Sequence, residues 1–137
     1  MRHRKHNKKL GRSGAHRSAL LSALVVALIK RRSITTTVVK AKEAKQLAEK
    51  MVTLARKGTV PARRLAAARL HDDDATALLF KEIVPIFEGR NGGYTRVVKL
   101  GQRASDGSEM AILQWVEKLA ADKPAEAPAE KPAEAKA

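Results

Sequence analysis

Residues 92–100 read GGYTRVVKL, residues 101–108 read GQRASDGS and residues 110–116 read MAILQWV. The first and last of these segments are rich in β-branched and other apolar residues, and the segment between them contains Gly and Asp, which favour turns. The pattern predicts two strands, over residues 94–100 and 110–116, that are joined as a hairpin. This hairpin supplies a sheet against which the preceding segments can pack.

Four helical segments are predicted before the hairpin, with one short β-branched strand among them. Apolar residues recur at helical spacing in these helices, and in the fourth they form a stripe of Leu79, Ile83, Ile86 and Phe87. The fourth helix must kink or end near Pro85. The first three helices are expected over residues 14–32, from about 39 to the stop at 58, and 61–70. The fourth is expected after caps at residues 72–74, and the strand over residues 33–38.

Residues with known positional preferences mark the helix ends. Ser13 is expected to cap the first helix, Gly58 to end the second and Pro61 to open the third. The sequence His71-Asp72-Asp73-Asp74 might suggest metal ligands or acid–base chemistry. Carboxylates at the start of a helix are more simply explained as caps that face the positive end of the helix dipole, so we favour capping.

The order α-β-α-α-α-β-β predicts an α+β fold in which the helices pack on one face of a small sheet. The chain has 137 residues, which is enough for one small domain with extensions. We expect a basic arm over residues 1–13, a folded domain over residues 14–119 and a solvated Pro/Ala/Glu/Lys tail over residues 120–137.

The formal net charge of +14 is concentrated at the start of the chain. Residues 1–42 contain no Asp or Glu, whereas the rest of the chain is nearly balanced. Acid-free basic segments neutralise phosphates, so a polyanion, and nucleic acid in particular, is the expected partner. The cations of this first third are Arg2, Arg4, Lys5, Lys8, Lys9, Arg12, Arg17, Lys30, Arg31, Arg32, Lys40 and Lys42.

Several classes of function are excluded by what the sequence lacks. There is no cysteine, no phosphate-binding glycine loop and no nucleophile elbow, so no catalytic residue, cofactor or small-molecule substrate is expected. The histidines match no familiar zinc spacing, so no metal is expected. The apolar run at residues 19–29 is too short to span a bilayer and is followed by Lys30-Arg31-Arg32 instead of a cleavage site, so no membrane is expected.

Two local features leave alternatives open. Lys40 and Lys42 stand near a helix N-terminus, where the dipole disfavours cations, so they either meet an external phosphate or are merely solvated, with Glu43 compensating. Gly92 and Gly93 either allow an RNA backbone to approach closely or form an ordinary turn. Tyr94 either stacks on a base or packs in the core.

Short strings along the chain resemble the bacterial family of large-subunit ribosomal protein seventeen. The resemblance covers about residues 1–118 and departs from the usual pattern at residues 104–107 and at Gln114-Trp115. The strings are MRHRK (1–5), KLGR (9–12), HR (16–17), Ile34 with Thr36-Thr37, KAKE (40–43), TLAR (53–56), RRLA (63–66) and GGYTR (92–96).

The resemblance implies a structural protein of the large subunit that binds ribosomal RNA near the polypeptide exit side, beside other large-subunit proteins and in the cytoplasm. A nucleoid-type DNA-binding protein and a membrane-active protein remain the alternatives; no clear helix-turn-helix or cationic amphipathic helix favours them. The candidate RNA-binding residues are Arg2, His3, Arg4, Lys5, His6, Lys8, Lys9, Arg12, His16, Arg17, Lys40, Lys42, Arg63, Arg64, Arg90, Gly92, Gly93, Tyr94, Arg96, Lys99 and Arg103.

Overall fold

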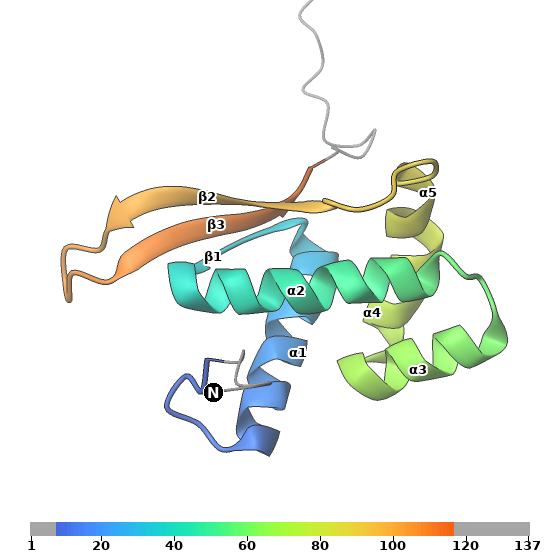
Figure 1. The fold of residues 1–137 in the computed structure, drawn as a ribbon, viewed down its shortest axis with the longest axis horizontal. Helices are drawn as coiled ribbons and strands as arrows, with labels where there is room; N and C mark the ends of the chain where they lie inside the picture. The colour runs from blue at the N-terminus through green and yellow to red at the C-terminus, as the bar shows by residue number, and fades with distance from the viewer. Residues whose placement is uncertain (1–7, 117–137) are drawn as a thin grey trace, which may run out of the picture.

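The computed structural model describes residues 8–116, and the predicted α+β class is confirmed (Figure 1). The helices and strands follow the predicted order, with one π-helical segment, η1, inserted in the fourth helix. The elements are α1 (Gly14–Arg31), β1 (Ser33–Thr37), α2 (Val38–Ala55), α3 (Val60–Leu70), α4 (Asp73–Leu78), η1 (Leu79–Ile83), α5 (Val84–Ile86), β2 (Thr95–Gln102) and β3 (Glu109–Trp115).

The sheet has the strand order β1-β3-β2, and both pairings are antiparallel. The predicted hairpin of β2 and β3 is confirmed; its turn is closed by hydrogen bonds between Arg103 and the segment 107–108. The early strand β1 pairs with β3, so that Ile34 lies opposite Leu113. The middle strand of the sheet is therefore the last one in the described chain.

The helices pack on one face of the sheet, as predicted. In Figure 1, α2 lies along the sheet, and α1 and α3 lie on the side of α2 away from the strands. Ala111, Leu113 and Trp115 alternate along β3 and are buried, whereas Val98 of β2, which pairs with Ile112 on the opposite face, is 44% exposed. Each strand therefore divides its side chains between the helical layer and the open face.

The core lies between α2 and the sheet and continues between α1 and the α4–α5 segment. Alanines line the buried side of α2, which allows neighbouring elements to approach this helix closely. Phe87 contacts Tyr94 and Trp115 with ring centroids 5.2 and 5.9 Å apart. Buried members include Val25, Leu28, Ile29, Ala44, Ala48, Met51, Val52, Leu70, Leu79, Ile83, Phe87, Tyr94, Leu113 and Trp115.

The fourth helix departs from the prediction of one regular α-helix. Its middle turn, η1, is π-helical, and the N–H of Val84 bonds to the carbonyl oxygen of Leu79, five residues earlier. Pro85 follows and has no N–H to donate, so the regular ladder cannot continue there. The wider turn keeps residues spaced by four, Leu79, Ile83 and Phe87, on the buried side. Ile86, predicted on the same stripe, is only half-buried.

The predictions for helix starts agree with the structure at two of the three starts considered. Asp72 Oδ1 accepts a hydrogen bond from the N–H of Ala75 at 2.7 Å, which confirms the capping role. Pro61 stands in the first turn of α3, and Thr59 caps that helix. Ser13 occupies the N-cap position of α1, but its side chain makes no capping hydrogen bond, so that detail of the prediction is wrong.

Candidate nucleic-acid interface

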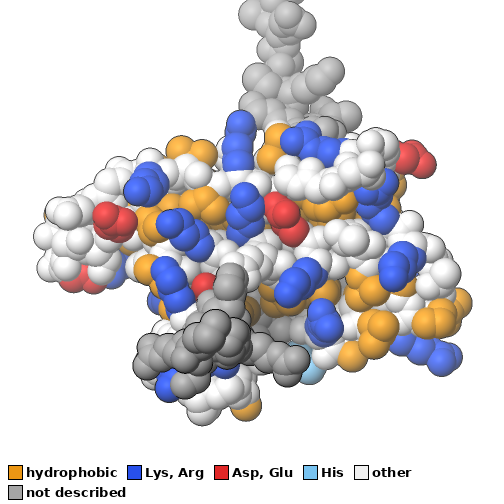
Figure 2. Space-filling view, in the orientation of Figure 1, with side chains coloured by type: hydrophobic (Ala, Val, Ile, Leu, Met, Phe, Trp, Pro, Cys, Tyr) orange, Lys and Arg blue, Asp and Glu red, His pale blue; other side chains and the backbone are white. Residues whose placement is uncertain are grey.

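Lys and Arg side chains are spread over several elements of the folded body. In the view of Figure 2 they lie over the sheet, α2 and α3, with fewer Asp and Glu side chains among them. Among residues 8–116, four ion pairs join cations to acids: Lys30 to Asp72, Arg32 to Glu82, Lys45 to Glu49 and Arg103 to Asp106. Several of the predicted RNA-binding cations within residues 8–116 are exposed and make no ion pair: Lys8, Lys9, Lys42, Arg63, Arg64, Arg96 and Lys99.

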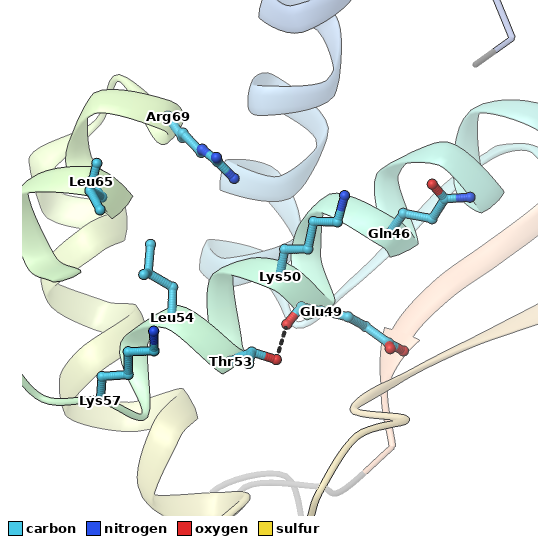
Figure 3. Close-up of a pocket in the computed structure, with 8 residues that line it drawn as sticks. All are labelled: Gln46, Glu49, Lys50, Thr53, Leu54, Lys57, Leu65 and Arg69. Atoms are coloured by element: carbon cyan, nitrogen blue, oxygen red, sulfur yellow. Dashed lines mark hydrogen bonds between the residues drawn. The ribbon is translucent and has the colours of Figure 1, made fainter. Parts of the chain in front are cut away.

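A hollow between α2 and α3 contains none of the predicted site residues (Figure 3). It has a volume of about 540 Å³, and its lining includes the cations Lys50, Lys57 and Arg69. Only a weak sequence signal marks these residues, because they come from two helices and do not cluster along the chain. Tertiary packing brings them together.

Residues 8–13 of the predicted arm form a tight turn before α1. The N–H of Arg12 bonds to the carbonyl oxygen of Lys9 at 3.1 Å, and Arg12 Nη1 donates to the carbonyl oxygen of Leu10 at 2.8 Å. Lys8, Lys9 and His16 are exposed, whereas Arg12 and Arg17 are half-buried. The predicted residues Arg2, His3, Arg4, Lys5 and His6 lie outside the described residues.

Lys40 and Lys42 lie in the first turns of α2, as predicted. No acid is present in the first turn of this helix, and the N-cap residue Thr37 makes no side-chain capping bond. Within residues 8–116 neither lysine has an ion-pair partner, Glu43 included. Within the described residues, the two cations therefore stand near the positive end of the α2 dipole without an acidic partner.

Arg63 and Arg64 are exposed in the first turns of α3, where Figure 1 places them at the opposite end of the helical layer from the start of α2. A shallow hollow beside them is lined by Val60, which is 64% exposed, and by Asp73. The two helix starts therefore present cations on separate parts of the body, and they do not form one compact site.

The turn that contains the two glycines is held from beneath by Arg56 and Tyr94. Arg56 Nη1 donates to the hydroxyl of Tyr94 at 3.0 Å and also to the carbonyl oxygen of Arg90. The Tyr94 hydroxyl donates to that same oxygen at 3.2 Å. Gly92 and Gly93 have φ values of +133° and +64°, which L-residues rarely adopt. The turn is a rigid feature of the surface.

The ring of Tyr94 is buried, with 2% of the residue exposed, and packs edge-on against Phe87. Two roles were open for Tyr94, and the structure agrees with packing in the core. Because its ring is buried, Tyr94 cannot stack on a base, and its prediction as an RNA-binding residue is corrected. Arg56, which the sequence did not single out as a functional residue, positions the turn through its contacts with Tyr94 and Arg90.

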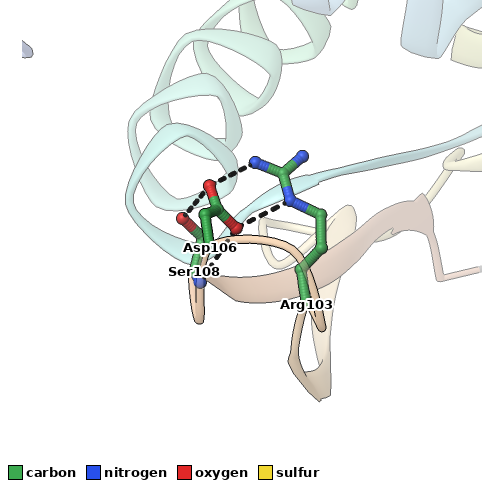
Figure 4. A network of polar contacts seen from close by, with 3 residues as sticks. All are labelled: Arg103, Asp106 and Ser108. Atoms are coloured by element: carbon green, nitrogen blue, oxygen red, sulfur yellow. Dashed lines mark hydrogen bonds and ion pairs between the residues drawn. The ribbon is translucent and has the colours of Figure 1, made fainter.

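The cations of the hairpin differ in the hydrogen bonds that they make. Arg96 and Lys99 are exposed on β2. When the side-chain amide of Gln114 is oriented with its oxygen toward Arg96, that oxygen accepts two hydrogen bonds from the guanidinium, at 2.5 and 2.8 Å. Arg103 makes a two-point contact with Asp106, at 2.9 and 2.6 Å (Figure 4). This contact, with help from Ser108, holds the pKa of the Asp106 carboxyl well below its ordinary value.

No described helix is both long and apolar enough to cross a membrane. Among residues 8–116 no group of three or more His, Asp or Glu side chains could hold a metal ion.

Comparison with known proteins agrees with this arrangement. A family model described as Ribosomal protein L17 matches residues 20–116. The chain is 51% identical over 117 residues to a protein named large ribosomal subunit protein bL17 from Methylacidiphilum infernorum, covering 85% of this chain and 89% of that one. A protein of the same name from Fusobacterium nucleatum is 46% identical over 116 residues, covering 85% and 100%. One from Alkaliphilus metalliredigens is 49% identical over 110 residues, covering 80% and 97%.

Proposed function

The chain belongs to the ribosomal protein L17 family, and from that premise we propose that it binds large-subunit ribosomal RNA by neutralising phosphates and recognising RNA shape. As a member of this family the chain is a structural constituent of the large ribosomal subunit in the cytoplasm, and it is not an enzyme. Its place is near the polypeptide exit side, beside neighbouring large-subunit proteins.

The observation that carries the proposal is the set of cations without acidic partners. Within the described part of the chain, Lys40 and Lys42 have none at the start of α2, and Arg63 and Arg64 have none at the start of α3. Repulsion among like charges is unfavourable for a protein alone, and phosphates that RNA folding brings together relieve it.

Arm and body have separate tasks in this proposal. Residues 1–13 thread between RNA helices, and the body docks through cations on three of its surfaces: the start of α2, the start of α3 and the region of the glycine turn. The residues that carry these contacts are Lys40, Lys42, Arg63, Arg64, Arg90 and Arg96.

Deleting residues 2–12 tests the arm. This segment contains six Lys and Arg, Arg2, Arg4, Lys5, Lys8, Lys9 and Arg12, so its loss lowers the salt slope of RNA binding by up to about 5. The circular dichroism spectrum and Tm of the body are expected to stay close to those of the full chain. A truncated chain that kept both the affinity and the salt slope would contradict the role of the arm.

Sedimentation of cell lysate through a sucrose gradient tests the assignment as a whole. The chain is expected to migrate with the large ribosomal subunit and to leave it at high salt. Migration with DNA instead would support a nucleoid-type protein.

A further inference from the structure

The hollow between α2 and α3 combines an apolar wall with uncompensated positive charge. Leu65 of α3 is 55% exposed, and in Figure 3 it faces the half-buried Leu54 of α2 across the space between the helices. A single exposed leucine is ordinary on a protein surface. Here two leucines form facing walls beside the cations Lys50, Lys57 and Arg69.

The charge of the hollow is not balanced by the residues that the structure describes. Within residues 8–116 the side chains of Lys50, Lys57 and Arg69 make no ion pair. The lining also contains one acid, Glu49, but its carboxylate is already engaged. It accepts a hydrogen bond from Thr95 Oγ1 at 3.1 Å and lies 3.9 Å from Lys45 Nζ, and Figure 3 shows it pointing toward the strands.

A second hollow continues from the first toward α1. The two share Lys50 and Arg69, and the second is also lined by Arg17 and Ser18, close to where the basic arm joins the body. The continuous surface therefore leads from the space between α2 and α3 to the attachment point of the arm. The second hollow carries Arg17, Lys50 and Arg69 against one acid, Glu43, so a flexible polyanion held by the arm has a predominantly cationic path into the first hollow.

We propose that this hollow binds an unstacked nucleotide of single-stranded ribosomal RNA. The base lies between Leu54 and Leu65 with the guanidinium of Arg69 beside it, and the flanking phosphates meet Lys50 and Lys57. A nucleotide combines a flat face of low polarity with an anionic backbone, and RNA recognition commonly uses bases that have left the stack. The inference rests on the proposed function and deepens it.

The test compares two double variants of the full chain. Lys50→Gln with Lys57→Gln removes two cations from the hollow, and Arg31→Gln with Lys81→Gln removes two exposed cations elsewhere. The probes are a labelled oligoadenylate of about twelve nucleotides and an A-form RNA duplex of about the same length. The first variant is expected to bind the single strand about tenfold more weakly, and the control less than about twofold. Binding of the duplex is expected to change equally in both.

A third variant separates base contact from charge. Leu65→Ser leaves every charge in place and alters a side chain that is already exposed, so the fold is expected to persist. Affinity for the single strand should fall about threefold with an unchanged salt slope, because a base contact contributes no counterion release. Equal single-strand affinities for the hollow and control double variants, or no effect of Leu65→Ser, would overturn the proposal.

The same question can be asked in large subunits purified from cells that express the chain. Ultraviolet crosslinking is expected to attach nucleotides to peptides that contain Lys50–Lys57 or Leu65–Arg69. Crosslinks that join the amines of Lys50 and Lys57 to carboxylates of another protein, without any crosslink to RNA, would also overturn the proposal. Failure of the unaltered chain to sediment with the large subunit would instead count against the proposed function, so the two failures are distinguishable.

Discussion

The indole nitrogen of Trp115 donates a hydrogen bond to the main-chain oxygen of Leu28, at 3.2 Å, and thereby joins the end of β3 to the last turn of α1. The same oxygen accepts the N–H of Arg32, the residue that ends the helix with a φ of +67°. A buried indole N–H is costly unless it finds an acceptor, and the Leu28 oxygen, already bonded to Arg32, supplies one. Trp115 is thereby tied to the end of α1 from 87 residues away.

Replacing Trp115 with Phe should separate this bond from ring packing. Trp115→Phe retains an aromatic ring beside Phe87 and loses the donor, so we expect a loss of about 1 kcal/mol in the free energy of unfolding. Trp115→Ala also removes the packing and should cost about 3–5 kcal/mol. Urea unfolding followed by circular dichroism measures both, because Trp115 is the single tryptophan and fluorescence is lost with it. An unchanged stability of Trp115→Phe would show that the hydrogen bond contributes little, and equal losses in the two variants would show that ring packing contributes little.

The contact of Arg56 with Tyr94 and Arg90 predicts a local effect on the glycine turn. Arg56→Met removes the donors beneath the turn, so amide hydrogen exchange over residues 90–94 should become faster, while exchange in β3 stays close to that of the unaltered chain. Lys81→Met, at an exposed position elsewhere, is the matched control. Unchanged exchange in the turn would mean that Tyr94 alone holds it.

Asp72 predicts a pH dependence of stability. The N–H of Ala75, and secondarily Lys30, lower the pKa of its carboxyl below the ordinary value of 3.8. A carboxyl whose pKa is lower in the folded state stabilises the fold above its unfolded-state pKa, and this contribution is lost as the pH falls through the folded-state pKa. Asp72→Asn retains a capping acceptor but does not titrate. Its Tm should lie below that of the unaltered chain at pH 6, and the gap should close toward pH 2.

The control for this experiment is Asp73→Asn, which lies in the first turn of α4 but is not the capping residue. If this control reproduces the pH profile of Asp72→Asn, the pH dependence of Tm arises from removing a negative charge near the helix start and not from the capping hydrogen bond.

Lys40 and Lys42 are predicted to hold RNA at the start of α2. Lys40→Gln with Lys42→Gln should lower the salt slope of RNA binding by about 2, since two phosphate contacts are lost, and should uncover a discrete RNA footprint. Arg31→Gln with Lys81→Gln again serves as the control. An unchanged footprint in the first variant would mean that the two lysines are merely solvated.

Features set by neighbouring residues could be predicted from the sequence, and features set by distant residues could not. The β2–β3 hairpin was predictable because its strands adjoin a loop of turn-forming residues, and the α3 and α4 caps because Thr59, Pro61 and Asp72 act on neighbouring amides. The π-helical turn was not, because residues spaced by four also share one face of a regular α-helix, so the apolar stripe does not distinguish the two. Likewise, nothing near Lys50 in the sequence points to Arg69 across the hollow.

The sequence by itself determined the acid-free basic start, the apolar periodicity of the helices, the hairpin and the family, because each is carried by local order along the chain. The tertiary structure alone decided that β1 pairs with β3, that Tyr94 is buried and clasped by Arg56, and that three unpaired cations meet two leucines between α2 and α3. Local periodicity tells which face of an element is apolar. Which remote segment covers that face depends on packing among elements far apart in the chain, and that packing also places the charges left outside.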